Sequence, residues 1–247
     1  MPTLDMKPKH RLDHLLLTRG LVDSREKARA LILAGQVIVD GQKIDKAGHA
    51  VAQDARVELL ESPRYVGRGG LKLEAALDHF AIQPAGKICL DIGSSTGGFT
   101  DCLLQRGAAR VYAIDVGTAQ LDWKLRNDPR VVVREQVNAR YLTRAEVPEP
   151  IDLAVADVSF ISITMILPVL LTLLAESAEM VILVKPQFEL EREQVGKGGI
   201  IRDPELHRQA CWRVEEAVQK LSFRTKIIPS PVLGAEGNQE FLLYARH

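Results

Sequence analysis

Residues 89–100 have the sequence CLDIGSSTGGFT, and this stretch decides the fold. An apolar strand, Ile88–Asp91, runs directly into a loop that contains Gly93, Gly97 and Gly98, and the loop opens a helix. In α/β sheets a ligand binds at this point, outside the carboxyl end of a strand. The glycine spacing is not Gly-x-Gly-x-x-Gly, which argues against a dinucleotide site.

From this loop outward, the chain alternates between apolar strands and helical stretches. The strands expected from these runs are Ile88–Asp91, Val111–Asp115, Val131–Arg134, Ile151–Asp157, Met180–Val184, Lys226–Pro229 and Phe241–Ala245. Continuous apolar strands between helices are typical of a mainly parallel sheet that is covered on both faces. The last two strands have no helix-length spacer between them, so we expect an antiparallel hairpin there. The sequence predicts an α/β fold with a seven-stranded sheet.

The amino-terminal region is built from shorter elements. Helices are predicted over 11–19 and 25–34, and short strands over 37–39, 42–44 and 56–60. Residues 62–70 contain Pro63, Gly67, Gly69 and Gly70, which is typical of a linker. We therefore expect a small α+β domain over 1–61, a linker over 62–70 and the large α/β domain over 71–247.

Composition excludes several classes of protein. The 247 residues carry 32 basic and 32 acidic side chains, but residues 1–70 hold 12 Lys and Arg against 9 Asp and Glu. This local basic excess is compatible with a nucleic-acid partner. Three cysteines without a CxxC pair argue against disulfides and a metal site, and they suit the reducing cytoplasm. The longest apolar stretch, 161–175, is interrupted and too short to span a membrane, and residues 1–10 do not resemble a signal peptide.

Four charged residues lie where the ligand should bind. Asp157 and Lys185 each follow four apolar strand residues, while Lys72 lies on the helix before the first strand and Glu240 begins the last. An unpaired charge is costly to bury, so Asp157 and Lys185 are predicted to be functional. For Lys72 and Glu240 taken alone, solvated surface charges are an equally good interpretation.

The glycine loop resembles the first motif of S-adenosylmethionine-dependent methyltransferases, which have a Rossmann-like class I fold. Glycines let the backbone approach the methionine part of that cofactor, and the helix amino terminus favours its carboxylate. The resemblance implies that Asp115 holds the ribose hydroxyls and that Asn138 contacts the adenine. The cofactor-binding residues predicted on this basis are Asp91, Gly93, Ser94, Gly97, Phe99, Asp115, Asn138 and Asp157.

The order Lys72, Asp157, Lys185, Glu240 resembles the catalytic tetrad of the FtsJ/RrmJ-type ribose methyltransferases. The implied reaction is attack of an RNA 2′-hydroxyl on the cofactor methyl group, with Lys185 drawing off the hydroxyl proton. Lys72 would position the ribose and favour the neutral form of Lys185, Asp157 would orient Lys185, and Glu240 would hold Lys72 or the ribose. An amino-methylating enzyme would have Asp/Asn-Pro-Pro-Tyr/Phe where this chain has Asp-Val-Ser-Phe at 157–160. A carbon-5 pyrimidine methyltransferase would need a cysteine there.

Residues 10–60 resemble the S4 RNA-binding domain, in which two helices and a hairpin present basic side chains to folded RNA. The contacts implied are Arg11, Arg25, Lys27, Arg29 and Lys43, with Arg68 from the linker. The sequence His-Arg-Leu-Asp at 10–13 also resembles the catalytic motif of a pseudouridine synthase family. It falls inside the first helix of the small domain, so Asp13 is predicted to be structural.

The order of S4 domain, linker and methyltransferase domain resembles the TlyA family, as do the segments 67–73 and 185–189. This resemblance implies 2′-O-methylation of a cytidine in 16S or 23S ribosomal RNA, or both, with rRNA or ribosomal subunits as partners. The alternatives are a haemolysin that acts on membranes and an inactive RNA-binding assembly factor. The intact glycine loop and the complete tetrad favour an enzyme. The glycine-rich loop 195–200 either closes over the target nucleotide or is a passive connection.

Overall fold

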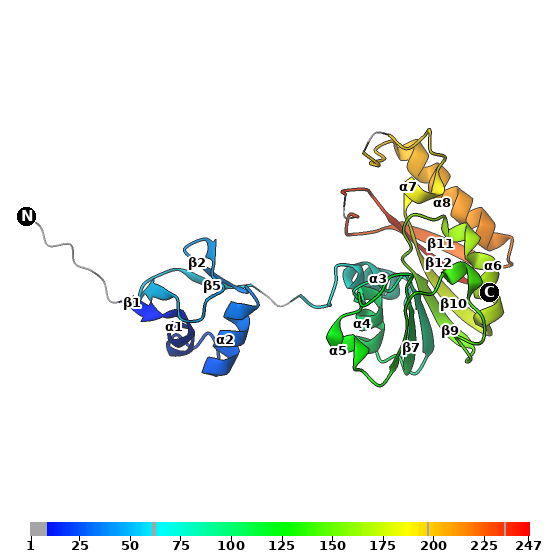
Figure 1. The fold of residues 1–247 in the computed structure, drawn as a ribbon. Coiled ribbons are helices and arrows are strands. Elements are labelled where there is room, and N and C mark those ends of the chain that lie inside the picture. Colours follow the sequence, from blue (N-terminus) through cyan, green and yellow to red (C-terminus); the bar gives the residue numbers. More distant parts are fainter. Residues whose placement is uncertain (1–8, 61–62, 197, 235) are drawn as a thin grey trace, which may run out of the picture. The chain divides into compact units, whose positions relative to one another are not determined.

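The chain forms two compact units, Met1–Pro63 and Arg64–His247, in a computed structural model (Figure 1). The structure describes residues 9–60, 63–196, 198–234 and 236–247. Residue 197 of the predicted closing loop therefore lies outside the described residues.

The amino-terminal unit packs two helices against short strands. The helices are α1 (Leu12–Thr18) and α2 (Arg25–Leu33). Strands β3 (Gln42–Lys43), β2 (Val37–Val39) and β5 (Val57–Leu59) form one antiparallel sheet, and β1 (Lys9–Arg11) pairs with β4 (Ala50–Ala52) in another. Ser24 caps α2 by accepting a hydrogen bond from the backbone N–H of Lys27. The β1–β4 pair was not predicted, because Lys-His-Arg has no apolar alternation that marks a strand.

The second unit is built on one seven-stranded sheet in the order β11-β12-β10-β9-β6-β7-β8. The strands are β6 (Ile88–Ile92), β7 (Arg110–Ile114), β8 (Val131–Arg134), β9 (Ile151–Ala156), β10 (Leu174–Val184), β11 (Arg224–Pro229) and β12 (Phe241–Arg246). All neighbouring pairs are parallel except the two that involve β12. The predicted fold class is thus confirmed, including the antiparallel pair at the end. Strand β10 begins earlier than expected, and its register with β9 shifts between Leu174 and Glu179.

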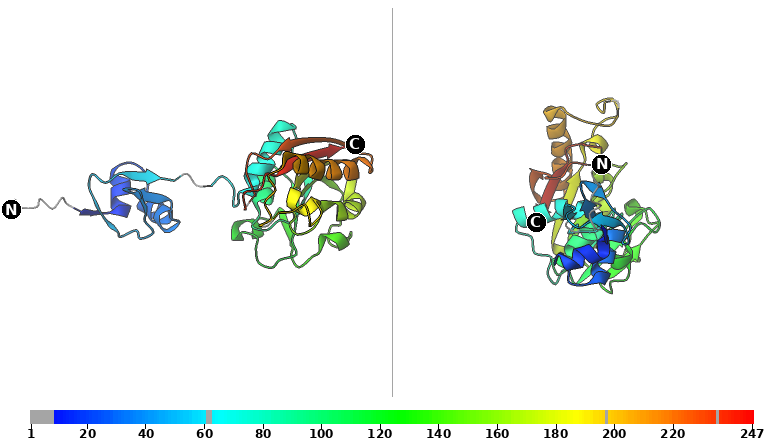
Figure 2. Two further views of the ribbon diagram at one scale, coloured as in Figure 1. Left: turned by 90° about the horizontal axis from the view of Figure 1, so that it is seen from above. Right: turned by 90° about the vertical axis from the view of Figure 1, so that its left-hand side faces the viewer.

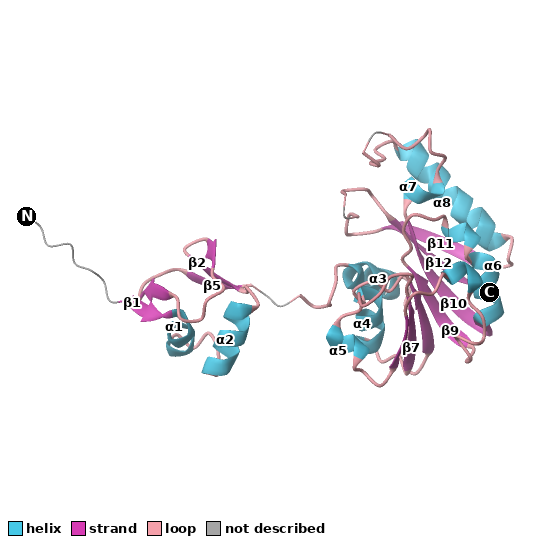
Figure 3. Cartoon of the chain, viewed as in Figure 1, coloured by secondary structure: helices cyan, strands magenta, loops and turns pink. Residues whose placement is uncertain are grey.

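Helices cover both faces of this sheet (Figure 3). One face carries α3 (Gly69–His79), α4 (Gly98–Gln105) and α5 (Trp123–Arg126), and the other carries α6 (Leu167–Leu173) and α8 (Pro204–Gln219). Figure 2 shows α8, in orange, running beside the last two strands. Alternate strand residues enter the two cores, so that Leu90 and Ile92 face the α8 side and Cys89 faces the α3 side.

Residues 64–70, expected in the linker, belong to the second unit. Tyr65 is buried, and the backbone N–H of Val66 donates to Oδ2 of Asp101 on α4 at 2.9 Å. Gly69 and Gly70 already form the first turn of α3, and a Cβ on Gly70 would collide with the Tyr65 ring. This packing fixes the start of α3, and with it the position of Lys72.

Two kinds of feature are absent from the part of the chain that the structure describes. No helix there combines the length and the apolar character needed to cross a membrane. No group of three or more His, Cys, Asp or Glu side chains there is arranged to hold a metal ion. The three cysteines are buried, and each is a free thiol.

Candidate active site at the strand ends

A cavity of about 930 Å³ lies across the carboxyl ends of five neighbouring strands. Lining residues follow each of these strands, among them Gly93 after β6, Asp115 after β7, Asn138 after β8, Asp157 after β9 and Gln187 after β10. Its volume is near the upper end of the range of roughly 300–1,000 Å³ for ligand pockets. The cavity therefore occupies the ligand position predicted from the glycine loop.

The glycines of the loop have separate tasks. Gly93 has a φ of 79°, and a Cβ there would collide with the backbone carbonyl of Asp157, so only glycine allows the loop to lie this close to β9. Gly97 has a φ of 98° at the start of α4, and a Cβ there would collide with Leu125 of α5. Gly93 shapes the cavity, whereas Gly97 permits packing behind it.

Asp115 and Asn138 are held at the wall of the cavity. Asp115 accepts hydrogen bonds from the backbone N–H of Ser95 at Oδ2 and of Gly117 at Oδ1, both at 2.7 Å. Asn138 accepts one from the backbone N–H of Arg140 at Oδ1 and so begins a short 3₁₀ helix. Both side chains line the cavity, as a direct cofactor contact requires.

Asp91 lies behind the loop in full burial. Its Oδ2 accepts a hydrogen bond from the Thr100 hydroxyl at 2.6 Å, while Oδ1 is buried with no hydrogen-bond partner in the described part of the chain. Burial raises the pKa of Asp91 to about 7, and the negative charges of Asp157 and Asp115 act in the same direction. Among the described residues, one oxygen of this buried carboxyl group is thus left without a hydrogen bond behind the loop.

The eight predicted cofactor residues divide into two groups. Those that line the cavity are Gly93, Asp115, Asn138 and Asp157. Those buried around the loop are Asp91, Ser94, Gly97 and Phe99. The Phe99 ring packs in the core on the α3 side, where a Cβ on Gly69 would lie 3.3 Å from it. The structure therefore gives Phe99 a packing role, and a direct cofactor contact for it stays a prediction.

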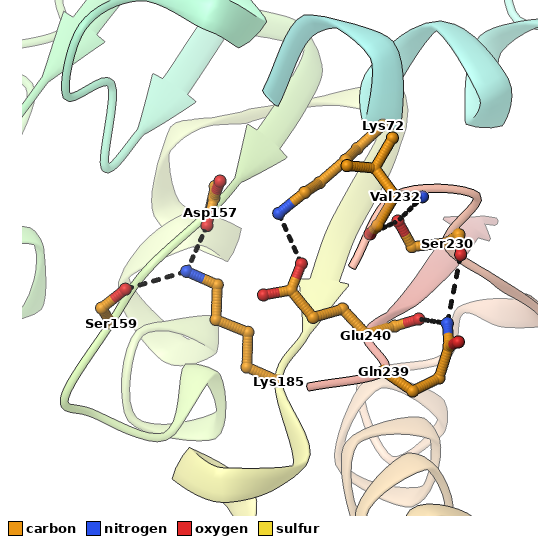
Figure 4. A network of polar contacts seen from close by, with 8 residues as sticks. All are labelled: Lys72, Asp157, Ser159, Lys185, Ser230, Val232, Gln239 and Glu240. Atoms are coloured by element: carbon orange, nitrogen blue, oxygen red, sulfur yellow. Dashed lines mark hydrogen bonds and ion pairs between the residues drawn. The ribbon is translucent and has the colours of Figure 1, made fainter. Parts of the chain in front are cut away.

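The four predicted catalytic residues form two ion pairs (Figure 4). Lys185 Nζ lies 2.5 Å from Asp157 Oδ1 and donates to the Ser159 hydroxyl at 2.8 Å. Lys72 Nζ lies 2.5 Å from Glu240 Oε2. The four charged ends gather between α3, the ends of β9 and β10 and the start of β12, as Figure 4 shows. Sequence positions 72, 157, 185 and 240 are thus brought together by the fold.

Glu240 is fixed by its neighbours in the loop before β12. Its backbone carbonyl accepts from the N–H of Ser230 at 2.8 Å and from the Gln239 amide at 2.8 Å. A Cβ on Gly234 would lie 2.6 Å from Glu240 Oε1, so only glycine leaves room for the carboxylate. Sequence reasoning did not identify these supports, because they depend on how the loop folds back on itself.

Asn238 ties the glycine-rich segment to this loop. Its buried side chain accepts from the N–H of Ile201 and donates to the carbonyl of Gly199, both at 2.8 Å. The last part of the segment 195–200 is therefore attached beside Glu240. Whether this segment closes over a nucleotide stays a prediction.

A buried carboxylate that the sequence did not single out joins the segments that follow β9 and β10. Glu189, at the end of α7 (Pro186–Glu189), accepts from the Ser162 hydroxyl at 2.5 Å and from the N–H of Ile163 at 2.9 Å. Burial raises its pKa. The segment after Lys185 is thereby bonded to the segment after Asp157. Glu189 belongs to the Lys-Pro-Gln-Phe-Glu motif at 185–189, but the motif does not indicate that this carboxylate binds Ser162 and Ile163.

Two aromatic rings lie at the cavity wall between these segments. Phe160 is 92% exposed with a φ of 68°, an unusual conformation for a residue other than glycine. Its ring centroid lies 5.3 Å from that of Phe188, and both residues line the cavity. This exposed aromatic surface was not predicted.

In the amino-terminal unit, two of the predicted RNA-binding arginines are anchored by one acid. Arg11 and Arg25 both donate to the buried Asp13 carboxylate, at 3.0–3.1 Å. The Arg11 hydrogen bond, supported by Arg25, lowers the pKa of Asp13 to about 2. Each arginine side chain remains more than half exposed. Asp13 therefore has a structural role, because its carboxylate holds the guanidinium groups of Arg11 and Arg25 at the surface.

The other predicted RNA contacts are also at surfaces. Lys27 pairs with Asp23 at 3.2 Å, and Arg29 is exposed on α2. The side chain of Lys43 lies across Gly35, where a Cβ would collide with it. Arg68 is exposed at the start of α3, in the second unit.

Comparison with known proteins agrees with this architecture. Residues 65–247 match the family model described as FtsJ-like methyltransferase, and residues 10–57 match the S4 domain. The chain belongs to the FtsJ-like methyltransferase family. The resemblance to the TlyA branch of this family is also confirmed by full-length relatives.

Three relatives illustrate the match to the FtsJ-like family. "Putative rRNA methyltransferase YqxC" of Bacillus subtilis is 50% identical over 96% of this chain and 85% of the relative. "16S/23S rRNA (cytidine-2′-O)-methyltransferase TlyA" of Mycobacterium tuberculosis is 46% identical over 98% of this chain and 91% of the relative. A solved structure of a "putative hemolysin" from Streptococcus thermophilus is 44% identical, with a TM-score of 0.73 over 97% of this chain and 88% of that one.

Proposed function

We propose that this protein transfers a methyl group from S-adenosylmethionine to the ribose 2′-hydroxyl of a cytidine in 16S or 23S ribosomal RNA, or both. The observation that carries the proposal is the gathering of two lysine–carboxylate pairs beside a cavity at the strand ends. The rRNA substrate and the cytidine are supported by the names of relatives that match over nearly the full chain.

The cavity fits the proposed cofactor. S-adenosylmethionine supplies a methyl group bound to a positively charged sulfur. Asp115 offers a fixed carboxylate for two ribose hydroxyls, and Asn138 offers an amide for the adenine. Gly93 lets the backbone approach the methionine part.

The proposed mechanism centres on Lys185. A ribose hydroxyl is a poor nucleophile at neutral pH, so its proton must leave as the oxygen attacks. Asp157 and Ser159 hold Nζ of Lys185 from two directions. The ammonium group of this ion pair first gives a proton to solvent, and the neutral amine then has the lone pair that accepts the hydroxyl proton. Lys72 and Glu240 form the neighbouring wall and position the ribose.

The amino-terminal unit would bring the enzyme to its substrate. Its basic side chains are held at the surface, and such charges bind phosphates with an affinity that falls as salt rises. We infer that the substrate is folded rRNA or a ribosomal subunit and that the reaction takes place in the cytoplasm.

The function is tested by methylating ribosomal subunits from cells that lack this protein. Purified protein and labelled cofactor are added, and the rRNA is digested and analysed by mass spectrometry for 2′-O-methylcytidine. We expect the modification with the wild type and its loss with Lys185→Ala. Lys220→Ala is the matched control, because this exposed lysine forms a surface pair with Glu216 on α8. Methylation of a base, or of no nucleotide, would contradict the proposal.

A further inference from the structure

We propose that Gln187 holds the Watson–Crick edge of the target cytosine through hydrogen bonds to N3 and the exocyclic amino group. The inference rests on the proposed function and deepens it, because it names the residue that contacts the base. It concerns the part of the cavity that the cofactor residues do not line.

Strand order separates the two ends of the cavity. Asp115 and Asn138 follow β7 and β8, whereas Gln187 follows β10, and β6 and β9 lie between them. Asp157, after β9, is therefore central. Since Lys185 directly follows β10 and lies two residues before Gln187, we place the target ribose on the β10 side.

One atom of the Gln187 amide lacks a hydrogen-bond partner among the residues that the structure describes. Its Oε1 is buried without a hydrogen bond in the described part of the chain, and the residue lines the cavity. Buried polar groups are normally satisfied, so an exception beside a ligand site points to the ligand. The neighbouring Ser159 and Ser162 are already bonded to Lys185 and Glu189.

The helix turn that carries Gln187 is held in place. Glu189 bonds it to the segment after β9, and the Glu189 carbonyl accepts from Arg213 of α8 at 2.8 Å. The backbone N–H of Phe188 donates to the Lys185 carbonyl at 2.9 Å. The backbone positions that carry the amide and the catalytic amine are therefore held relative to each other, as a ribose and its own base are.

The chemistry of the amide matches cytosine. Cytosine presents a donor at its amino group and an acceptor at N3, and a glutamine amide offers one acceptor and one donor. The rings of Phe160 and Phe188, which are tilted by 51° to each other, provide adjacent aromatic faces, and a base can stack on one of them. A rotated amide could also pair with uracil, so the decisive test removes the amino group and keeps the rest of the base.

The test uses ribosomal subunits assembled from rRNA that carries either cytidine or its 4-deamino analogue at the methylated position. Single-turnover methylation is measured for the wild type and Gln187→Met, which keeps the side-chain length and removes the amide. We expect the wild type to lose roughly 10- to 100-fold in rate on the analogue. Gln187→Met should lose a similar factor on cytidine and nothing further on the analogue.

The controls separate this inference from the proposed function. Gln219→Ala changes a glutamine on α8 that bonds to Thr225, and it should behave as the wild type. Cofactor affinity and thermal unfolding of Gln187→Met are measured in parallel, and Gln187→Ala is the second variant if Gln187→Met does not fold. A wild type that is indifferent to the amino group, or a variant that remains as sensitive as the wild type, overturns the role of Gln187. A wild type that does not methylate cytidine overturns the proposed function instead.

Discussion

The two lysine–carboxylate pairs have the same chemistry and different surroundings. Both have nitrogen–oxygen distances of 2.5 Å, but the Glu240 side chain is 3% exposed and that of Asp157 is 22% exposed. Glu240 is enclosed by its own loop, whereas Asp157 lines the cavity and shares Lys185 with Ser159. The Lys72–Glu240 pair, called the closed pair below, is therefore enclosed by protein, whereas the Lys185–Asp157 pair, called the open pair, borders the cavity through Asp157.

The largest effect is expected at the open pair. Lys185→Ala should lower the methylation rate by roughly 10²–10⁴-fold, because general-base assistance is lost, while thermal unfolding changes little. Lys185→Arg should fail as well, since a guanidinium stays protonated. Rates are measured under single turnover. Near-native rates in Lys185→Arg would show that charge alone suffices and that another group accepts the proton.

Breaking the closed pair, Lys72–Glu240, should lower the free energy of unfolding. Lys72→Met leaves the Glu240 carboxylate buried without its partner, and breaking such a pair costs about 3–5 kcal/mol in the free energy of unfolding. The double variant Lys72→Met/Glu240→Gln should recover much of this loss, because no buried charge remains. Urea unfolding gives both values. If Lys72→Met lost activity but kept its free energy of unfolding, the two pairs would not differ in the way proposed here.

Asp91 sharpens the comparison, because it is a buried carboxyl without a lysine. Its pKa of about 7 in the folded protein lies above the ordinary value of 3.8, so the folded state binds the extra proton between these values. The free energy of unfolding should therefore fall as pH rises from about 4 to 7, by at most ~1.4 kcal/mol per pH unit from this group. Asp91→Asn should remove this part of the slope. If the free energy of unfolding had the same pH dependence in the wild type and in Asp91→Asn, the raised pKa of Asp91 would be contradicted.

The smallest effect is expected at Ser159, whose hydroxyl accepts a hydrogen bond from Lys185 of the open pair. Ser159→Ala removes one hydrogen bond to Lys185 and should slow methylation by roughly 10-fold, in line with about 1.5 kcal/mol for a bond to a charged group. Thermal unfolding should not change, because the residue is exposed. Ser177→Ala, at an exposed position early in β10, is the control. A loss as large as that of Lys185→Ala would give Ser159 a role of its own.

The sequence predicted the sheet well, because its evidence is local. An apolar run such as Ile151–Ala156 predicts a buried strand, and the glycines after β6 predict a tight loop. Neither prediction needs knowledge of the rest of the chain. The four charged residues were predicted by their positions at strand ends and by resemblance. The fold brings them together because the carboxyl ends of β9 and β10, the start of the antiparallel strand β12 and the first turn of α3 lie at one edge of the sheet.

The contacts that support the site could not be predicted in this way. Glu189 meets Ser162, and Asn238 meets Gly199, only after the segments have folded. Phe99 follows the glycine loop in sequence, yet its ring turns to the core. The neighbours of a side chain in a loop or first helical turn depend on long-range packing, which no local pattern records.

The bridge made by Asn238 has a consequence for the speed of recognition. A loop that is loose in the free protein loses conformational entropy when it binds, and that loss weakens binding. Here Gly199 and Ile201 are already held by one buried amide. Part of the ordering therefore occurs during folding, so an RNA that bound this portion of the segment would find it already in one arrangement.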